Sequence, residues 1–352
     1  MLSLELFDYD LPSELIAQEP LKERDQAKML VLNKKDDKII HSHFYELPHF
    51  LKPGDLVIIN KTRVIKARLV AKAEDTGGKL EIFFLESISR NIFKAMVHSR
   101  KKARVGRTFI VGEECRLAIK DFEEYMGADA KAIVEILSEI SVFDLLEKYG
   151  QVPLPHYIRR APKEEDIDYY QTIFAEKGPS VAAPTAGLHF TETVIKNLKE
   201  KGVSVEPIYL HVGLGTFKPV KTQDIISHRM DAEYYEIPEE TAKKIIKTRE
   251  QGNWVVACGT TSVRTLESWK FDKSKLSGCT DLFIYPGFRF DVIDGLITNF
   301  HMPKSTPLIL VCAFAGREKI LNAYKEAIQM NYGFLSYGDA MLILPEIDNS
   351  SA

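Results

Sequence analysis

The chain has 352 residues, of which 45% are hydrophobic and 28% are charged, and its formal net charge is −3. This composition is ordinary for a soluble globular protein with a sizeable core, and the length suggests about two domains. The longest apolar run, Pro307 to Ala315, is too short to span a bilayer. The overall charge neither indicates nor excludes nucleic-acid binding, because local basic patches matter more.

The cysteines and the N-terminus indicate the compartment. Cys115, Cys258, Cys279 and Cys312 form no C-x-x-C pair, and their spacing fits no zinc site or disulfide framework. The N-terminal segment is acidic and is broken by Pro12, unlike a signal peptide. We therefore expect a cytoplasmic protein that does not contact a membrane.

The first part of the chain predicts a strand followed by a small barrel. The run DLVIIN at 55–60 follows a Pro-Gly turn and has the pattern of a buried strand. From about Val64 to Leu137, short strand-like runs alternate with turn residues, which indicates a small antiparallel β-barrel. A helical pattern then ends at Gly150.

After residue 150, helical and strand-like segments alternate, which favours an α/β sheet covered by helices. We expect a discontinuous α/β catalytic domain, 1–62 and 151–352, interrupted by an inserted β-barrel domain, 63–150. The expected helices are 166–176, 191–201, 238–251, 261–270, 304–315 and 317–331, and the expected strands are 203–212, 254–258, 281–285, 296–300 and 340–344.

Two glycine-containing turns are candidate binding elements. The stiff loop Pro179–Phe190 holds Thr185 and Gly187 and ends near His189, although an ordinary connecting loop is an equal alternative. The turn Gly259-Thr260-Thr261-Ser262 opens a helix that carries Arg264 in its first turn. Free N–H groups and hydroxyls there suit an anion, and simple helix capping is the alternative.

Other polar groups follow predicted strands. Asp281 begins one strand, and His301 follows another, where ligands of open α/β sheets often bind. His301 has the chemistry of an acid or base, and a structural histidine is the alternative. Gly213 and Gly215, before Thr216, form a G-x-G without the third glycine of a dinucleotide site, so a bulge is the alternative.

Basic residues concentrate in three segments without intervening acids, which is typical of phosphate binding, although solvated strand edges are the alternative. The residues we expect at such a surface are Lys61, Arg63, Arg68, Arg100, Lys101, Lys102, Arg104, Arg159 and Arg160. We expect no metal site, since His41, His43 and His49 lack a matching carboxylate or thiol cluster.

Long motifs occur over nearly the whole chain: FDYDLPSELIAQEPLKERDQAKMLVL, NKTRVIKARL, PLPHYIRR, GPSVAAPTAGLHFT, LHVGLGTFKPV, SHRMDAEYYEIP, GTTSVRTLES, TDLFIYPGFRFDVIDGLITNFHMPKST, AFAGRE and YGDAMLIL. Together they resemble one family, the S-adenosylmethionine:tRNA ribosyltransferase-isomerases of queuosine biosynthesis. The chain departs locally from the pattern of that family at Lys61, His156 and Pro307.

The resemblance implies an α/β domain with an inserted barrel and an unusual reaction. The ribosyl unit of S-adenosylmethionine is transferred to the 7-aminomethyl-7-deazaguanine at the wobble position of tRNAs for Tyr, His, Asn and Asp. It is isomerised to give epoxyqueuosine, with adenine and methionine released. S-adenosylmethionine is a substrate, so no cofactor is implied, and we expect a monomer without an obligate protein partner.

The reaction requires a base, an acid and a site for each substrate. We expect His189 and His301 as the acid–base pair, supported by Asp281. For S-adenosylmethionine we expect Thr185, Gly187, Gly213, Gly215, Thr216, Gly259, Thr260, Thr261, Ser262 and Arg264. The alternatives are an S-adenosylmethionine-dependent methyltransferase, a non-catalytic RNA-binding protein and a hydrolase of nucleotide derivatives.

Overall fold

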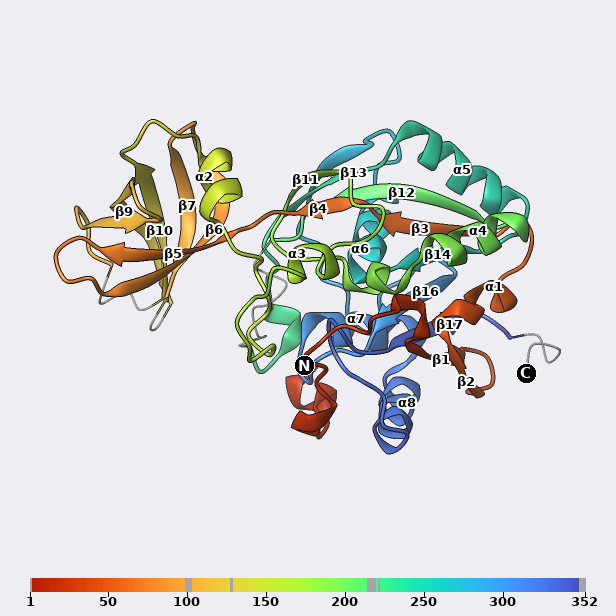
Figure 1. Cartoon of the computed structure of the whole chain (residues 1–352). Coiled ribbons are helices and arrows are strands. Elements are labelled where there is room, and N and C mark those ends of the chain that lie inside the picture. The colour runs from red at the N-terminus through yellow and green to blue at the C-terminus, as the bar shows by residue number, and fades with distance from the viewer. Residues whose placement is uncertain (1, 99–102, 127–128, 214–219, 221, 348–352) are drawn as a thin grey trace.

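The computed structural model describes residues 2–98, 103–126, 129–213, 220 and 222–347. A large mixed sheet with helices on both faces forms the main body, and a separate closed barrel lies to one side of it (Figure 1). This is the α/β main domain with an antiparallel barrel that the sequence predicts.

The main sheet has nine strands in the order β15-β13-β12-β3-β14-β16-β17-β1-β2. Its centre, β12-β3-β14-β16, is parallel. Because both faces of these strands are covered, β3, β14 and β16 are buried along their whole length. In sheet order the bounds are Ser277–Thr280, Glu233–Glu236, Ser204–Leu210, Leu56–Asn60, Val255–Cys258, Gly295–Asn299, Ala340–Leu344, Lys28–Asn33 and Ile39–His43.

Alternate residues of the central strands contribute to two cores. Leu296 belongs to the core under α5, α6, α7 and α8, whereas Ile297 belongs to the core under α1 and α4. This alternation follows from the two-residue period of a strand. The bounds are Leu47–Phe50 for α1, Glu192–Glu200 for α4, Glu239–Glu250 for α5, Thr260–Trp269 for α6, Thr306–Ala315 for α7 and Arg317–Gln329 for α8.

The barrel closes in the order β10-β7-β6-β5-β8-β9. Closure leaves no free strand edge, and alternating apolar residues fill the interior. Helix α2, Val142–Tyr149, packs on it through Val142, Leu145 and Leu146. The bounds are Arg68–Ala73 for β5, Lys79–Ser87 for β6, Ile92–Val97 for β7, Thr108–Val111 for β8, Cys115–Met126 for β9 and Asp129–Ile136 for β10.

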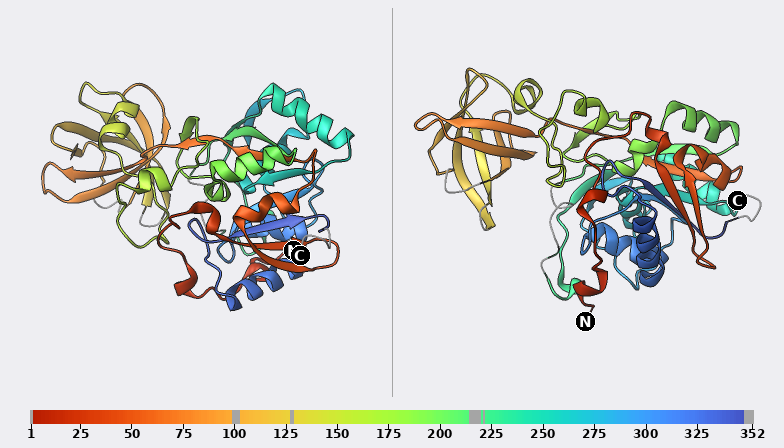
Figure 2. Two further views of the ribbon diagram at one scale, coloured as in Figure 1. Left: turned by 45° about the vertical axis from the view of Figure 1, so that its right-hand side comes forward. Right: turned by 60° about the horizontal axis from the view of Figure 1, so that its bottom comes forward.

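A short parallel ribbon joins the two bodies. Strand β4, Thr62–Val64, which leads into the barrel, pairs with β11, Lys177–Ser180, which follows the return of the chain. The views in Figure 2 show both the barrel and this connection beside the main sheet. Within the described ranges, no helix is both long and apolar enough to cross a membrane.

Two expected elements were wrong. The helix expected over 166–176 is only the single turn α3, Asp166–Tyr169, after which Tyr170 turns inward and is buried. The strand expected over 281–285 is not formed. Strand β15 ends at Thr280, and the Leu282 carbonyl accepts a hydrogen bond from Nε of Arg264.

Candidate functional site

A cavity of about 390 Å³ lies at the carboxyl ends of β14 and β16, where α6 and α7 begin. This is the edge at which ligands bind in open α/β sheets. The lining residues that carry polar side chains are His156, Tyr157, Thr185, Thr260, Thr261, Thr298, Asn299, His301, Lys304, Ser305 and Ser336. No aspartate or glutamate lines it among the residues described, and prolines, alanines and other apolar residues form the remainder.

His301 is held at the wall of this cavity from three sides. Its Nε2 lies 2.7 Å from Oγ1 of Thr298. Its backbone N–H donates to the Tyr324 hydroxyl at 3.1 Å, and its carbonyl accepts from the Tyr9 hydroxyl. Nδ1 has no hydrogen-bond partner in the described part of the chain. Desolvation lowers the pKa of His301 to about 3, so the imidazole is neutral at physiological pH.

His189 lies in the 3₁₀ turn Thr185–His189 and is almost fully buried. Its Nε2 is 3.2 Å from the amide nitrogen of Asn299. Burial lowers the pKa of His189 to about 4, so this ring is also neutral. It lines a small recess of about 20 Å³ beside Arg24 instead of the large cavity.

The two histidines therefore do not form a facing pair. They contact consecutive residues of β16, Thr298 and Asn299. Side chains of consecutive strand residues point to opposite faces of a sheet. His301 alone of the two lines the large cavity.

Part of the predicted glycine turn lies at the cavity. Gly259 precedes α6 with a φ of 86°, a conformation that favours glycine, and Gly259, Thr260 and Thr261 line the cavity together with Thr185 from the opposite wall. Ser262 does not, because its hydroxyl donates to the Cys258 carbonyl at 2.7 Å and its side chain is fully buried.

Arg264 is placed differently from the prediction of an anion-binding residue. Its guanidinium forms an ion pair with Glu233, and both side chains are buried. Nε donates to the Leu282 carbonyl at 3.0 Å. With these partners, Arg264 holds neighbouring segments together and does not line the large cavity.

Three further predicted residues lie away from the cavity. Asp281 is exposed and does not line the large cavity, so its supporting role stays a prediction. Gly187 faces Thr172 and Phe174. The Gly213 N–H donates to Glu233 at 2.8 Å. Gly215 and Thr216 lie outside the described residues.

The predicted basic surface divides into paired and unpaired residues. Lys61 pairs with Glu176 and Arg68 with Glu81. Arg160 binds Asp166 through two nitrogens, at 2.6 and 2.7 Å, and also pairs with Glu19, which makes it a structural residue. The exposed residues Arg63, Arg104 and Arg159 have no ion-pair partner in the described ranges. Arg100, Lys101 and Lys102 lie outside those ranges.

Asn299 closes a predicted strand at the edge where ligands bind, but the sequence assigns it no role in the site. Asn299 lines the cavity and is 2% exposed. Its amide nitrogen donates to the Leu335 carbonyl at 2.9 Å. Across the described residues, no group of three or more His, Cys, Asp or Glu is arranged to hold a metal ion.

Comparisons with known proteins agree with this architecture. The model of the family described as "Queuosine biosynthesis protein" matches residues 4–343. An S-adenosylmethionine:tRNA ribosyltransferase-isomerase of Sulfurihydrogenibium sp. is 50% identical over 96% of this chain and 98% of its own length. One of the same name from Carboxydothermus hydrogenoformans is 48% identical over 97% of this chain and its whole length.

A solved structure is also similar. The crystal structure of an S-adenosylmethionine tRNA ribosyltransferase from Thermotoga maritima has 37% sequence identity and a TM-score of 0.55, and the match covers 96% of this chain and all of that one. With the family model matched over nearly the full length, this chain belongs to the queuosine biosynthesis protein family.

Proposed function

We propose that this protein transfers the ribosyl unit of S-adenosylmethionine to the 7-aminomethyl-7-deazaguanine at the tRNA wobble position and isomerises it, giving epoxyqueuosine-tRNA, adenine and methionine. The observation that carries this proposal is sequence identity of 48% to 50%, over nearly the full length of the chain, to relatives named for that activity. The cavity at the strand ends supplies a site for the chemistry.

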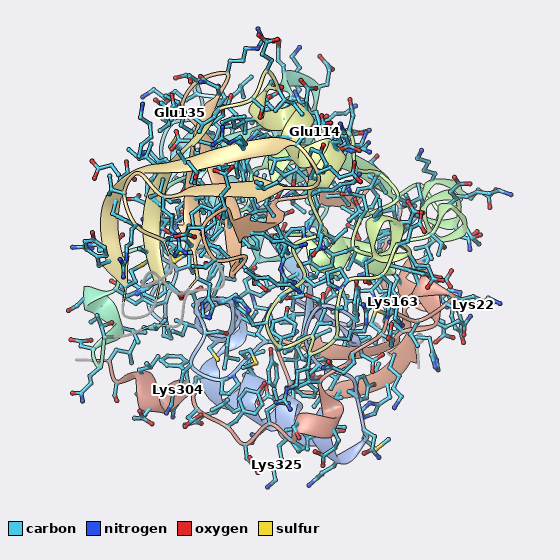
Figure 3. The ribbon with its side chains drawn as sticks, turned by 60° about the vertical axis from the view of Figure 1, so that its left-hand side comes forward. Lys22, Glu114, Glu135, Lys163, Lys304 and Lys325 are labelled. Atoms are coloured by element: carbon cyan, nitrogen blue, oxygen red, sulfur yellow. The ribbon has the colours of Figure 1, made fainter. Side chains whose placement is uncertain are left out.

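The cavity suits a substrate with a carboxylate at one end. The first turns of α6 and α7 both line it, and helix N-termini stabilise negative charge. Lys304 adds a cation, although its ammonium is shared with Glu5 and Asp8 at 2.7 and 2.8 Å (Figure 3 labels Lys304 in the view from the barrel side). We assign the methionine carboxylate to the segment around Thr260 and Ser305, and not to Arg264.

His301 is the residue we assign to proton transfer. The ribose carbon next to the positive sulfur is acidic, and a neutral imidazole can take its proton. Desolvation lowers the pKa of His301 and keeps the ring neutral before the reaction, and the imidazolium formed on taking the proton can return it to the departing adenine. His189 is assigned a positioning role because the Asn299 amide occupies its Nε2 lone pair.

The inserted barrel domain, 63–150, and the adjoining linker are assigned to tRNA. Arg63, Arg104 and Arg159 are exposed and have no carboxylate partner among the described residues, so we take their charges to be available to phosphates. We include Arg100, Lys101 and Lys102 in this surface from the sequence alone.

The acceptors we propose are tRNAs for Tyr, His, Asn and Asp. We further propose that the protein acts in the cytoplasm as a monomer and needs no metal or other cofactor.

The test is mass spectrometry of tRNA carrying the aminomethyl-deazaguanine, incubated with the protein and S-adenosylmethionine while adenine is quantified. The proposal predicts a ribosyl-derived mass gain with one adenine released per modified tRNA. A methyl-sized gain would identify a methyltransferase, tRNA binding without turnover would identify a binding protein, and adenine release without tRNA would identify a hydrolase.

A further inference from the structure

Two polar atoms of residues in the cavity wall have no hydrogen-bond partner in the described structure: Oδ1 of Asn299 and Oγ1 of Thr261. Asn299 is 2% exposed and Thr261 is 9% exposed. Buried polar atoms in proteins are almost always paired, so each unpaired atom requires an explanation. Their common position at one cavity suggests that a ligand supplies the missing partners.

The orientation of the Asn299 amide is fixed by its neighbours. The Leu335 carbonyl, 2.9 Å away, can only accept, so the amide nitrogen must face it. The same nitrogen is 3.2 Å from Nε2 of His189, which therefore accepts and carries no proton. Oδ1 is left as an acceptor and needs an N–H or O–H donor from the ligand.

Thr261 lies in the first turn of α6, directly after the neighbouring strand β14. Strands β14 and β16 are parallel partners, and the Gly259 N–H continues the pairing by donating to the Ile297 carbonyl at 2.7 Å. Neighbouring strands are about 4.8 Å apart. A hydroxyl can donate, so the wall offers an acceptor from β16 and a donor from the start of α6, on adjacent segments.

We infer that Asn299 and Thr261 recognise the adenine of S-adenosylmethionine: Oδ1 of Asn299 accepts from the 6-amino group, and the Thr261 hydroxyl donates to the adjacent ring nitrogen. This inference rests on the proposed function. The adenine edge carries a donor and an acceptor side by side, and the absence of carboxylates from the described lining suits a neutral base. His189 is a positioning residue that holds the Asn299 amide in this orientation.

The probes are S-adenosylhomocysteine, which lacks the reactive sulfonium, and its 6-oxo counterpart, S-inosylhomocysteine, in which an acceptor replaces the 6-amino donor. Binding to the full chain is measured by calorimetry. The wild-type protein is expected to prefer the adenosyl probe by about tenfold or more, and Asn299→Ala to bind both probes alike.

Thr261→Val, which keeps the shape of the side chain, is expected to weaken the adenosyl probe about fivefold to tenfold. The matched control is Thr265→Val, one turn along the same helix, because Thr265 is buried, bonded to the Thr261 carbonyl and outside the cavity lining. It is expected to leave the affinity unchanged. Equal effects of both valine substitutions would overturn the role of Thr261.

The positioning role of His189 has its own readout. His189→Gln, whose side-chain oxygen can accept from Asn299, is expected to keep the preference for the adenosyl probe, whereas His189→Leu is expected to lose it. Equal binding of both probes by the wild type would overturn the inference and leave the proposed function intact. Absence of ribosyl transfer to tRNA in the mass-spectrometric assay would overturn the proposed function and the inference with it.

Discussion

Arg264 and Glu233 form a buried ion pair between α6 and β13, and the second carboxylate oxygen of Glu233 accepts the Gly213 N–H at 2.8 Å. Arg264 also donates to the carbonyls of Thr280 and Leu282. Through this pair, helix α6 is joined to the segment after β12, which holds Gly213, and to the segment after β15, which holds Leu282.

Removal of one partner of this pair should destabilise the fold more than it changes the affinity for S-adenosylmethionine. Glu233→Gln leaves the Arg264 guanidinium buried without its counter-ion, which typically costs about 3–5 kcal/mol. Urea unfolding should show this loss. Lys243→Met, which breaks only exposed pairs with Glu239 and Glu240, is the control and should change stability by less than about 1 kcal/mol. A loss from Glu233→Gln no larger than the control would contradict the structural role of the pair.

His301→Ala should lower the turnover number by about 10²–10⁴-fold if His301 moves the proton. Affinity for S-adenosylhomocysteine should change less than threefold. Because the pKa of His301 is lowered to about 3, its ring signals in an NMR titration should stay constant from pH 8 to pH 5. A midpoint near pH 6.5 would show that the ring is solvated, and turnover close to wild type would remove His301 from the chemistry.

His189 should make the protein less stable in mild acid. Its pKa falls from an unfolded value of 6.5 to about 4 in the folded state, so between these values the unfolded chain binds more protons. The stabilising contribution is complete above pH 6.5 and is lost as the pH falls towards 4. At pH 5 the loss is about 2 kcal/mol. Unfolding free energies at pH 7.5 and pH 5 should show it for the wild type and less of it for His189→Gln. An equal pH dependence in both would contradict the prediction.

Charge reversal at the exposed arginines should weaken tRNA binding. Arg63→Glu, Arg104→Glu and Arg159→Glu should each lower the affinity severalfold and reduce the slope of log affinity against log salt by about one or more. Lys196→Glu on α4, where the native lysine is exposed, is the control for net charge. If Lys196→Glu weakens binding as much as the arginine variants, these arginines form no specific phosphate surface.

The barrel could be predicted almost strand by strand because each run alternates apolar and polar residues between clear turns. Strand β6, Lys79–Ser87, is one such run, KLEIFFLES, and it directly follows the turn residues Gly77 and Gly78. The segment 281–285 has a strand-like composition, but its Leu282 carbonyl bonds to the Arg264 side chain of α6, which no local pattern reveals. Local sequence predicts a strand well when its apolar residues alternate and clear turns bound it. It fails when a distant side chain takes the backbone hydrogen bonds.

The same limit explains the site. The glycine turn before α6 is visible in sequence because it follows an apolar strand directly. The role of Asn299 depends on His189, 110 positions away, and on the Leu335 carbonyl, 36 positions away. The partners of Arg160 include both the nearby Asp166 and the distant Glu19, so its guanidinium is already bonded in the folded chain.

The central claim is that the ribosyl unit, and not the methyl group, of S-adenosylmethionine reaches the tRNA. The most direct measurement follows two preparations of S-adenosylmethionine, one labelled in the ribose and one in the methyl group, with the aminomethyl-deazaguanine tRNA. The account predicts that the ribose label enters the tRNA in step with adenine release, while the methyl label leaves with methionine, and that His301→Ala slows both. Methyl label in the tRNA would contradict it.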